Sequence, residues 1–141
     1  MKLKLLQVRE STGIKAISPS DVYEAMGPEA LADRECFWVL HLNSQMEIVE
    51  KELVSMGGLD TASAHPREVY KKAILNSASC LILVHNHPSG DLTPSYEDKK
   101  INKRLTEAGE LLGIPVTDHI IISTKGYYSF AADKTYRNED V

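Results

Sequence analysis

The 141-residue sequence is poor in cysteine and has no long hydrophobic run. Its two cysteines, Cys36 and Cys80, lie in apolar segments that resemble strands, which is typical of buried free thiols in a cytoplasmic protein. No stretch approaches the roughly 18 consecutive apolar residues that indicate a membrane-spanning helix. Gln7, Arg9 and Glu10 interrupt the apolar start of the chain, and no small-residue cleavage site follows, so we expect no signal peptide.

The sequence also lacks an excess of basic residues. Lysine and arginine together number 16 and aspartate and glutamate 20, which gives a formal net charge of -4. Proteins that depend on phosphate contacts usually carry a basic excess or a basic face. The charge therefore argues against nucleic acid as a partner but leaves it open as an alternative. One cluster of cations, interleaved with glutamates, is typical of a solvated helix face: Lys99, Lys100, Lys103 and Arg104.

What the chain has is the composition of one globular domain. Its length allows a single core, and 43% hydrophobic with 26% charged residues are ordinary proportions for a soluble protein. We expect one domain over residues 1–141, with an N-terminal extension at 1–29, a core over roughly 30–131 and a polar tail at 132–141 that is frayed from residue 134 onward. Weak alternation over Leu3–Glu10 suggests an edge strand.

Hydrophobic patterning predicts a sheet flanked by helices. Asn43-Ser44-Gln45 is a hairpin loop, so the strands on either side of it are antiparallel, and the helix that begins at Pro66 can act as a crossover. The expected fold is α/β (α+β), with a mixed, mainly antiparallel central sheet flanked by helices. We expect strands over 36–42, 46–56, 81–87, 116–123 and 127–130, and helices over 19–26, 66–75 and 96–112.

The candidate functional residues are concentrated in one stretch, which begins at residue 81. The unbroken apolar run Leu81–Val84 is typical of a strand buried on both faces, and it leads into His85 and His87. Because side chains alternate along a strand, the two imidazoles share a face, whereas Asn86 points the other way and is expected to hold the loop. Pro88 then ends the strand, because it cannot donate to a ladder.

The helix that follows supplies a carboxylate. Asp98 lies three residues before the helix's apolar stripe, and so on its core-facing edge, where a carboxylate near two imidazoles needs a cation. His85, His87 and Asp98 therefore form a three-ligand set for one zinc ion, with a fourth position open to water. Ser95-x-x-Asp98 also fits a capping box, which would account for both residues without a metal. The stripe consists of Ile101, Leu105, Ala108 and Leu112.

These residues resemble a known family. His-Asn-His-Pro-Ser-Gly-Asp at 85–91, followed by Pro-Ser-x-x-Asp at 94–98, is similar to the metal-binding motif of the JAB/MPN (JAMM) metallopeptidase domain, and most of all to its bacterial RadC branch. His-Pro-Arg-Glu at 65–68, Leu-Gly-Ile at 112–114 and Asp-His-Ile-Ile at 118–121 are also RadC-like, so the resemblance covers roughly 30–131. It implies the MPN/JAB (cytidine-deaminase-like) architecture.

The resemblance also implies catalytic roles. In the JAMM family, a glutamate near the first strand acts as the general base, and the serine of Ser-x-x-Asp stabilises the oxyanion. Ser95 matches that serine. Glu35, just ahead of the strand at 36–42, matches the position of the base and is favoured over Glu52 on the returning strand.

The remaining polar residues have weaker signals. His119 follows Asp118 at a strand start, and we favour a structural polar pair between them over a role in orienting a metal ligand. His41 and His65 have no metal-type spacing to the site, and His65 before Pro66 is most simply a helix-entry residue.

The leading hypothesis is a cytoplasmic zinc hydrolase of the JAMM type, which uses a metal-activated water on a peptide or isopeptide bond of a peptide or protein substrate. The alternative is a RadC-type binding module associated with DNA repair, which keeps the metal site without peptidase activity. RadC relatives usually carry a helix-hairpin-helix module ahead of this domain, and this chain has no room for one, so we expect the catalytic-type domain alone. That expectation weakens the DNA-binding alternative.

A third hypothesis is a zinc hydrolase of a phosphodiester or a small amide. A zinc deaminase would need His-x-Glu and Pro-Cys-x-x-Cys, which the sequence lacks. The sequence implies no membrane partner and no particular oligomeric state.

Overall fold

The computed structural model describes residues 10–57 and 64–138. The edge strand expected at Leu3–Glu10 falls, apart from its last residue, outside the described residues. None of the described helices is both long and apolar enough to cross a membrane.

The helices are α1 (Pro19–Ala25), α2 (Pro66–Leu75) and α3 (Tyr96–Leu112), with a 3-10 turn η1 (Pro28–Leu31). The strands are β1 (Cys36–Leu42), β2 (Ile48–Met56), β3 (Cys80–Asn86), β4 (Val116–Ser123), β5 (Gly126–Ser129) and β6 (Lys134–Arg137).

The strands form one six-stranded sheet in the order β2-β1-β3-β4-β5-β6. Only β3 and β4 pair in parallel, and all other neighbours are antiparallel, which confirms the predicted mixed and mainly antiparallel sheet. The two strands of the parallel pair are joined by α3, because a parallel connection needs a long crossover. The hairpin between β1 and β2 turns at Asn43, whose side-chain oxygen accepts the amide protons of Gln45 and Glu47, both at 3.0 Å.

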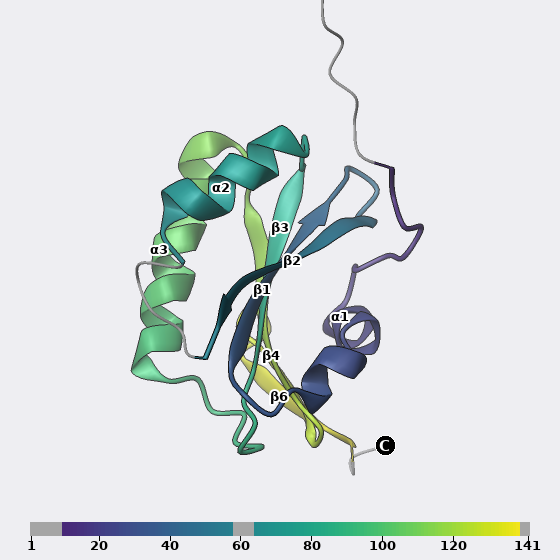
Figure 1. Ribbon diagram of the computed structural model, residues 1–141, viewed down its shortest axis with the longest axis vertical. Coiled ribbons are helices and arrows are strands. Elements are labelled where there is room, and N and C mark those ends of the chain that lie inside the picture. Colours follow the sequence, from purple (N-terminus) through teal and green to yellow (C-terminus); the bar gives the residue numbers. More distant parts are fainter. Residues whose placement is uncertain (1–9, 58–63, 139–141) are drawn as a thin grey trace, which may run out of the picture.

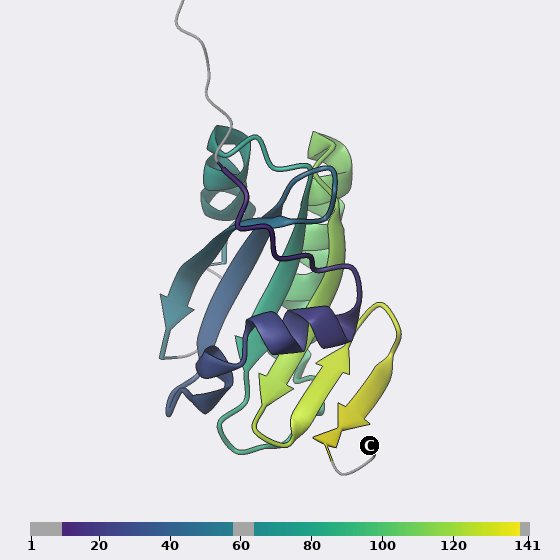
Figure 2. The same ribbon diagram turned by 90° about the vertical axis from the view of Figure 1, so that its right-hand side faces the viewer.

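Three layers result from the alternation along the central strands. Phe37, Val39, Leu81 and Leu83 face α2 and α3, while the residues between them in sequence face α1. Figure 1 shows α2 and α3 on one side of the sheet and α1 on the other, and Figure 2 shows α1 lying across the strands. Both faces of β1 and β3 are therefore buried, as the apolar run in β3 predicted.

Both ends of the described chain contribute more to the fold than the sequence suggested. The prediction of a frayed C-terminal tail is wrong for residues 134–137, because they form β6 and pair with β5. Tyr127 and Tyr136 face each other in that pairing, with ring centroids 4.8 Å apart. β6 is an edge strand without a buried face, so its sequence shows no apolar alternation. At the other end, Ala16, Val22 and Met26 are buried in the core.

The inner face of α3 differs from the predicted stripe at its last position. Ile101 and Leu105 are buried as expected, but Leu112 is 48% exposed. The buried residue in the last turns is Gly109 instead. The hydroxyl of Tyr70 on α2 donates to the carbonyls of Leu105 and Ile114, at 3.2 and 3.1 Å, and so occupies the space beside that glycine. The close approach of α2 to α3 beside Gly109 explains why this position is occupied by glycine.

Substituting Gly109→Ala is expected to destabilise the fold, although alanine has the higher helix propensity by about 1 kcal/mol. A Cβ at Gly109 would collide with the Tyr70 hydroxyl and the Ile114 carbonyl. We expect a net loss of about 1–3 kcal/mol in the free energy of unfolding, measured by urea denaturation. Glu110→Ala, at an exposed position of the same helix, should change it by less than about 0.5 kcal/mol. Equal behaviour of the two variants would contradict this packing.

Candidate metal centre

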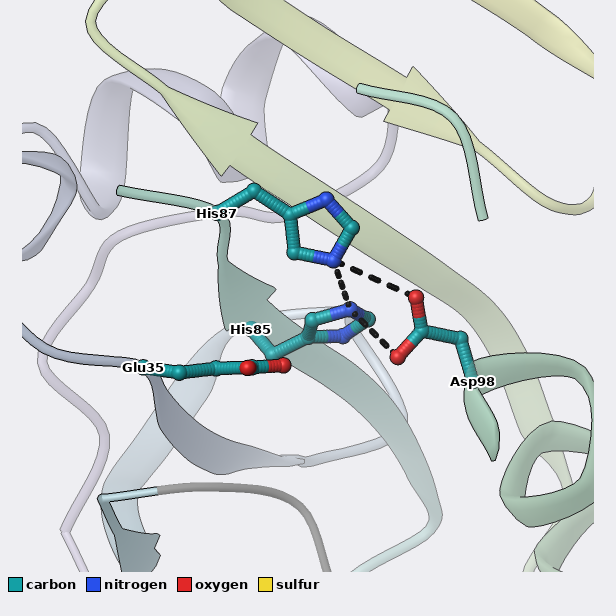
Figure 3. A group of neighbouring side chains, drawn as sticks. All are labelled: Glu35, His85, His87 and Asp98. Carbon is teal, nitrogen blue, oxygen red and sulfur yellow. Dashed lines mark hydrogen bonds and ion pairs between the residues drawn. The ribbon is translucent and has the colours of Figure 1, made fainter. Parts of the chain in front are cut away.

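The end of β3 brings two imidazoles together. His85 is fully buried and His87 is partly buried, and their Nε2 atoms lie 3.1 Å apart. His87 is one residue beyond β3, but its backbone amide still donates to the Ile122 carbonyl of β4 at 3.0 Å, so the extended conformation continues through it. The two side chains therefore share a face, as the alternation predicted (Figure 3).

The first turn of α3 adds the carboxylate. Asp98 is 1% exposed, with its Oδ1 3.0 Å from Nε2 of His85 and its Oδ2 3.2 Å from Nε2 of His87. The capping box is present as well. Ser95 Oγ accepts the Asp98 amide at 3.0 Å, and Asp98 Oδ2 accepts the Ser95 amide at 2.8 Å. The cap and the contacts with the imidazoles are thus made together, and the cap fixes the carboxylate in the direction of the histidines.

Hydrogen bonds on the far side of each ring determine which nitrogen is free. The Nδ1–H of His87 donates to the Asp91 carbonyl at 2.6 Å, so Nε2 carries the lone pair in the neutral ring. Nδ1 of His85 lies 2.9 Å from Nε2 of His119, whose own Nδ1 lies 3.3 Å from Asn102 Oδ1. Because the amide oxygen of Asn102 can only accept, His119 donates to it and accepts from His85. Both metal-type histidines thus present Nε2 lone pairs.

The ring of His119 therefore contacts the metal-type histidine His85. The favoured prediction, that this ring forms a structural polar pair with Asp118, is wrong. The carboxylate of Asp118 accepts from the Ser129 hydroxyl at 2.8 Å and from backbone amides instead. Burial and the neighbouring His85 hold the pKa of His119 well below its usual range, so its ring stays neutral and able to accept. The sequence could not reveal this contact, because it depends on the parallel pairing of β3 with β4.

The electrostatics of the group call for a cation. Burial lowers the pKa of His87, but its hydrogen bonds to Asp98 and to the Asp91 carbonyl outweigh this and raise the pKa above its ordinary value. Burial also raises the pKa of Asp98, yet the two histidines hold it far below its usual range. Two nitrogen lone pairs and a buried carboxylate repel one another unless a proton or a metal ion lies between them.

Glu35 completes the group from the segment before β1. One ligand atom from each of Glu35, His85, His87 and Asp98 lies within 4.8 Å of all the others. In Figure 3 the Glu35 and Asp98 carboxylates approach the imidazoles from different sides. Asn86 holds this segment in place. Its side-chain oxygen accepts the Cys36 amide at 2.7 Å, and its amide nitrogen donates to the carbonyl of residue 34 at 2.9 Å.

The alternative base, Glu52, lies elsewhere. It stands opposite Val39 on β2 and belongs to a separate group with His41 and Glu50. His41 thus has no role beside His85, as its spacing predicted, but it has carboxylate neighbours that the sequence did not reveal. His65 caps the start of α2, where its ring nitrogen accepts the Arg67 amide at 3.1 Å, which confirms it as a helix-entry residue.

The donor atoms fit a small divalent cation. Zinc bonds of ~2.0–2.1 Å in tetrahedral geometry place two ligand atoms ~3.4 Å apart. The three separations among His85, His87 and Asp98 are 3.0, 3.1 and 3.2 Å. The three side chains would therefore need to move apart by only a few tenths of an ångström to hold an ion. The partly buried Glu35 lies close enough to contact a water molecule or substrate atom as the fourth ligand. The arrangement is a candidate metal-binding cluster.

Replacing His119 with phenylalanine tests the contact with His85. The ring of His119 stacks on Phe130 at 4.3 Å, so phenylalanine preserves this packing while it removes the acceptor of His85 and the donor to Asn102. We expect metal affinity at this site to fall about 10–100-fold, since partners of metal-ligating histidines commonly contribute that much. Competition with a chelator measures the affinity. His65→Ala serves as the control, because this histidine caps α2 and does not belong to the metal-type group. Equal affinities in the two variants would refute a role for His119.

Comparison with known proteins finds a matching family model and similar relatives. The RadC-like JAB domain family model matches residues 16–136. A UPF0758 protein of Caldanaerobacter subterraneus subsp. tengcongensis is 46% identical over 136 residues, which cover 90% of this chain and 58% of the relative. A UPF0758 protein of Methanosarcina acetivorans is 47% identical over 116 residues, or 82% of this chain and 51% of the relative. The chain thus spans about half the length of the curated relatives it matches.

Proposed function

This chain belongs to the RadC-like JAB domain family, and we propose that it is a zinc-dependent hydrolase of the JAMM type that cleaves a peptide or isopeptide bond. One observation carries the proposal: two Nε2 lone pairs and a buried carboxylate converge on one point, and a second carboxylate lies within 4.8 Å of them. Such a group combines a set of metal ligands with a base, which is what hydrolysis by an activated water requires.

His85, His87 and Asp98 are the residues that would hold the ion. A zinc ion bound by three protein ligands lowers the pKa of a bound water to about 7 and polarises a carbonyl. The protein's part is to keep the ligands deprotonated and aligned. Asp91 and His119 fix the tautomers of the two imidazoles, and the amide of Ser95 fixes the carboxylate.

Glu35 is proposed as the general base. It is partly buried, lies within reach of the ligand atoms, and has a backbone position set by two neighbours. Its carbonyl accepts the Gly57 amide at 2.8 Å, and the next residue's amide is held by Asn86. A carboxylate fixed in this way can take the proton of an attacking water and pass it to the leaving amine.

Ser95 is proposed as the donor to the oxyanion. Its Oγ accepts the Asp98 amide, which leaves the hydroxyl proton available, and the residue is exposed at the start of α3 beside the metal ligands. Capping the helix and donating to a substrate oxygen use different parts of the same hydroxyl group. The proposed role is therefore compatible with the cap seen in the structure.

The rival assignments receive less support. The four cations of α3 predicted to form a solvated face are exposed, and the acidic residues between them, Glu97 and Glu107, leave no uniformly basic surface. The names of the relatives, UPF0758 proteins, assign no substrate. A phosphodiester or small amide substrate would use the same residues, so the choice of a peptide or isopeptide bond rests on the family alone.

Metal analysis tests the ligand set. After dialysis against metal-free buffer, the zinc-loaded chain is expected to retain one tightly held ion, and His87→Ala is expected to lose it. His65→Ala should retain it. Plasma mass spectrometry on the dialysed proteins gives the stoichiometry. A native chain that binds no zinc tightly, or a His87→Ala variant that retains as much zinc as the native chain, would remove the basis of the proposal.

Hydrolysis of a panel of peptide and isopeptide substrates by the zinc-loaded chain tests the reaction. Glu35→Gln should lower kcat by about 10²–10⁴-fold, since it removes the base, while the bound zinc is retained. Asp33→Asn is a matched control, because Asp33 is an exposed carboxylate two residues away that pairs with Arg34 and does not belong to the metal-type group. Equal losses in both variants, or no hydrolysis of either substrate class by the native chain, would count against the proposed reaction.

A further inference from the structure

A second group of ligand-type side chains lies on the same face of the sheet, at the opposite end of β1. His41 faces α2 and is completely buried. Glu50 stands directly opposite it on β2, and Glu52 stands two residues further along the same strand. One ligand atom from each of the three lies within 4.8 Å of the other two. Cross-strand pairing rather than sequence spacing brings them together.

Two atoms of this group are buried without a hydrogen-bond partner. They are Nε2 of His41 and Oε1 of Glu52, which face each other at 3.6 Å. Buried polar atoms nearly always have partners, so such a pair indicates a ligand. A zinc-sized ion with bonds of ~2.0–2.2 Å would place two donors ~3.4 Å apart, close to the separation seen here.

The other side of the His41 ring is held by α2. The side-chain nitrogen of Asn76 lies 3.3 Å from Nδ1 of His41 and 3.3 Å from Glu50 Oε2. Because a carboxylate can only accept, this nitrogen is a donor, so Nδ1 of His41 accepts and a neutral ring carries its proton on Nε2, toward Glu52. An ion at Nε2 would displace that proton to Nδ1, a half-turn of the Asn76 amide would bring its oxygen to accept it, and Glu50 would exchange this donor for the ion.

A lysine now supplies the positive charge. Lys72 Nζ lies 3.2 Å from Glu50 Oε2 and 3.7 Å from Glu52 Oε2. Its side chain is 46% exposed, whereas those of the two glutamates are 10% and 15% exposed. A half-exposed ammonium group on a flexible chain can turn into solvent at little cost. The two carboxylates are far less exposed, so they have less room to turn away.

We propose that His41, Glu50 and Glu52 form a second binding site for a divalent transition-metal ion, for which Lys72 competes. One imidazole with two carboxylates suits zinc, cobalt or manganese. The register of β1 with β3 pairs His41 with Leu81 and Phe37 with His85, so the two sites are four residues apart on β1, or roughly 13 Å along the strand. An ion here would join the edge strand β2 to β1 without any part in the reaction at the first site.

Cobalt titration of the full chain carrying His87→Ala, in which the first site is disabled, tests the proposal through the d–d absorption of the ion. We expect one ion to bind. Adding Glu52→Gln should weaken binding at least 10-fold, and adding Lys72→Met should strengthen it several-fold, because the competing ammonium is gone. Glu68→Gln, an exposed acid on α2, should leave binding unchanged.

Two further measurements separate a loss of binding from a loss of folding and test the site in the unmutated chain. Circular dichroism reports whether each variant is folded, and misfolding cannot produce the tighter binding expected of Lys72→Met. In the chain without His87→Ala, the same titration should show a second, weaker step that Glu52→Gln abolishes. Absence of any binding to His87→Ala up to millimolar cobalt, or binding indifferent to both Glu52→Gln and Lys72→Met, would overturn the second site. Neither result would affect the first site.

Discussion

The repulsion between two imidazole lone pairs and a buried carboxylate is the constraint around which this fold is arranged. His85 and His87 present Nε2 atoms 3.1 Å apart, and the Asp98 carboxylate lies within 3.2 Å of both. Such a group is unfavourable unless a proton or a metal ion is shared among its members, because His85 and Asp98 are buried away from water. The rest of the local structure holds these three side chains in place against that repulsion.

Each of the three is held by a different part of the chain. The loop after β3 fixes His87 through the Asp91 carbonyl, β4 fixes His85 through His119, and the capping box of α3 fixes Asp98. These supports are hydrogen bonds to backbone or to neutral rings, so none of them adds a competing charge. A rigid arrangement of this kind favours an ion over a mobile proton, because the ligands need to move only a few tenths of an ångström to bind it.

Much of this could be predicted from the sequence because the signals were local. The apolar run before His85, the alternation to His87 and the spacing from Ser95 to Asp98 each lie within a few residues, and β3, α3 and the N-cap at Ser95 formed as expected. The long-range features were missed. The contact of His119 with His85 depends on the register of β4, and the grouping of His41 with Glu52 depends on the register of β2. Nothing in the local patterning of one strand fixes the identity of its neighbours.

The structure of the zinc-loaded chain, with the ion located by its anomalous scattering, tests the central claim most directly. The account predicts an ion bonded to Nε2 of His85, to Nε2 of His87 and to one oxygen of Asp98, with the Glu35 carboxylate beside the remaining position. An ion beside His85 and His87 that is bound through other atoms, or an Asp98 that stays on the Ser95 amide while the histidines bind the ion without it, would contradict it.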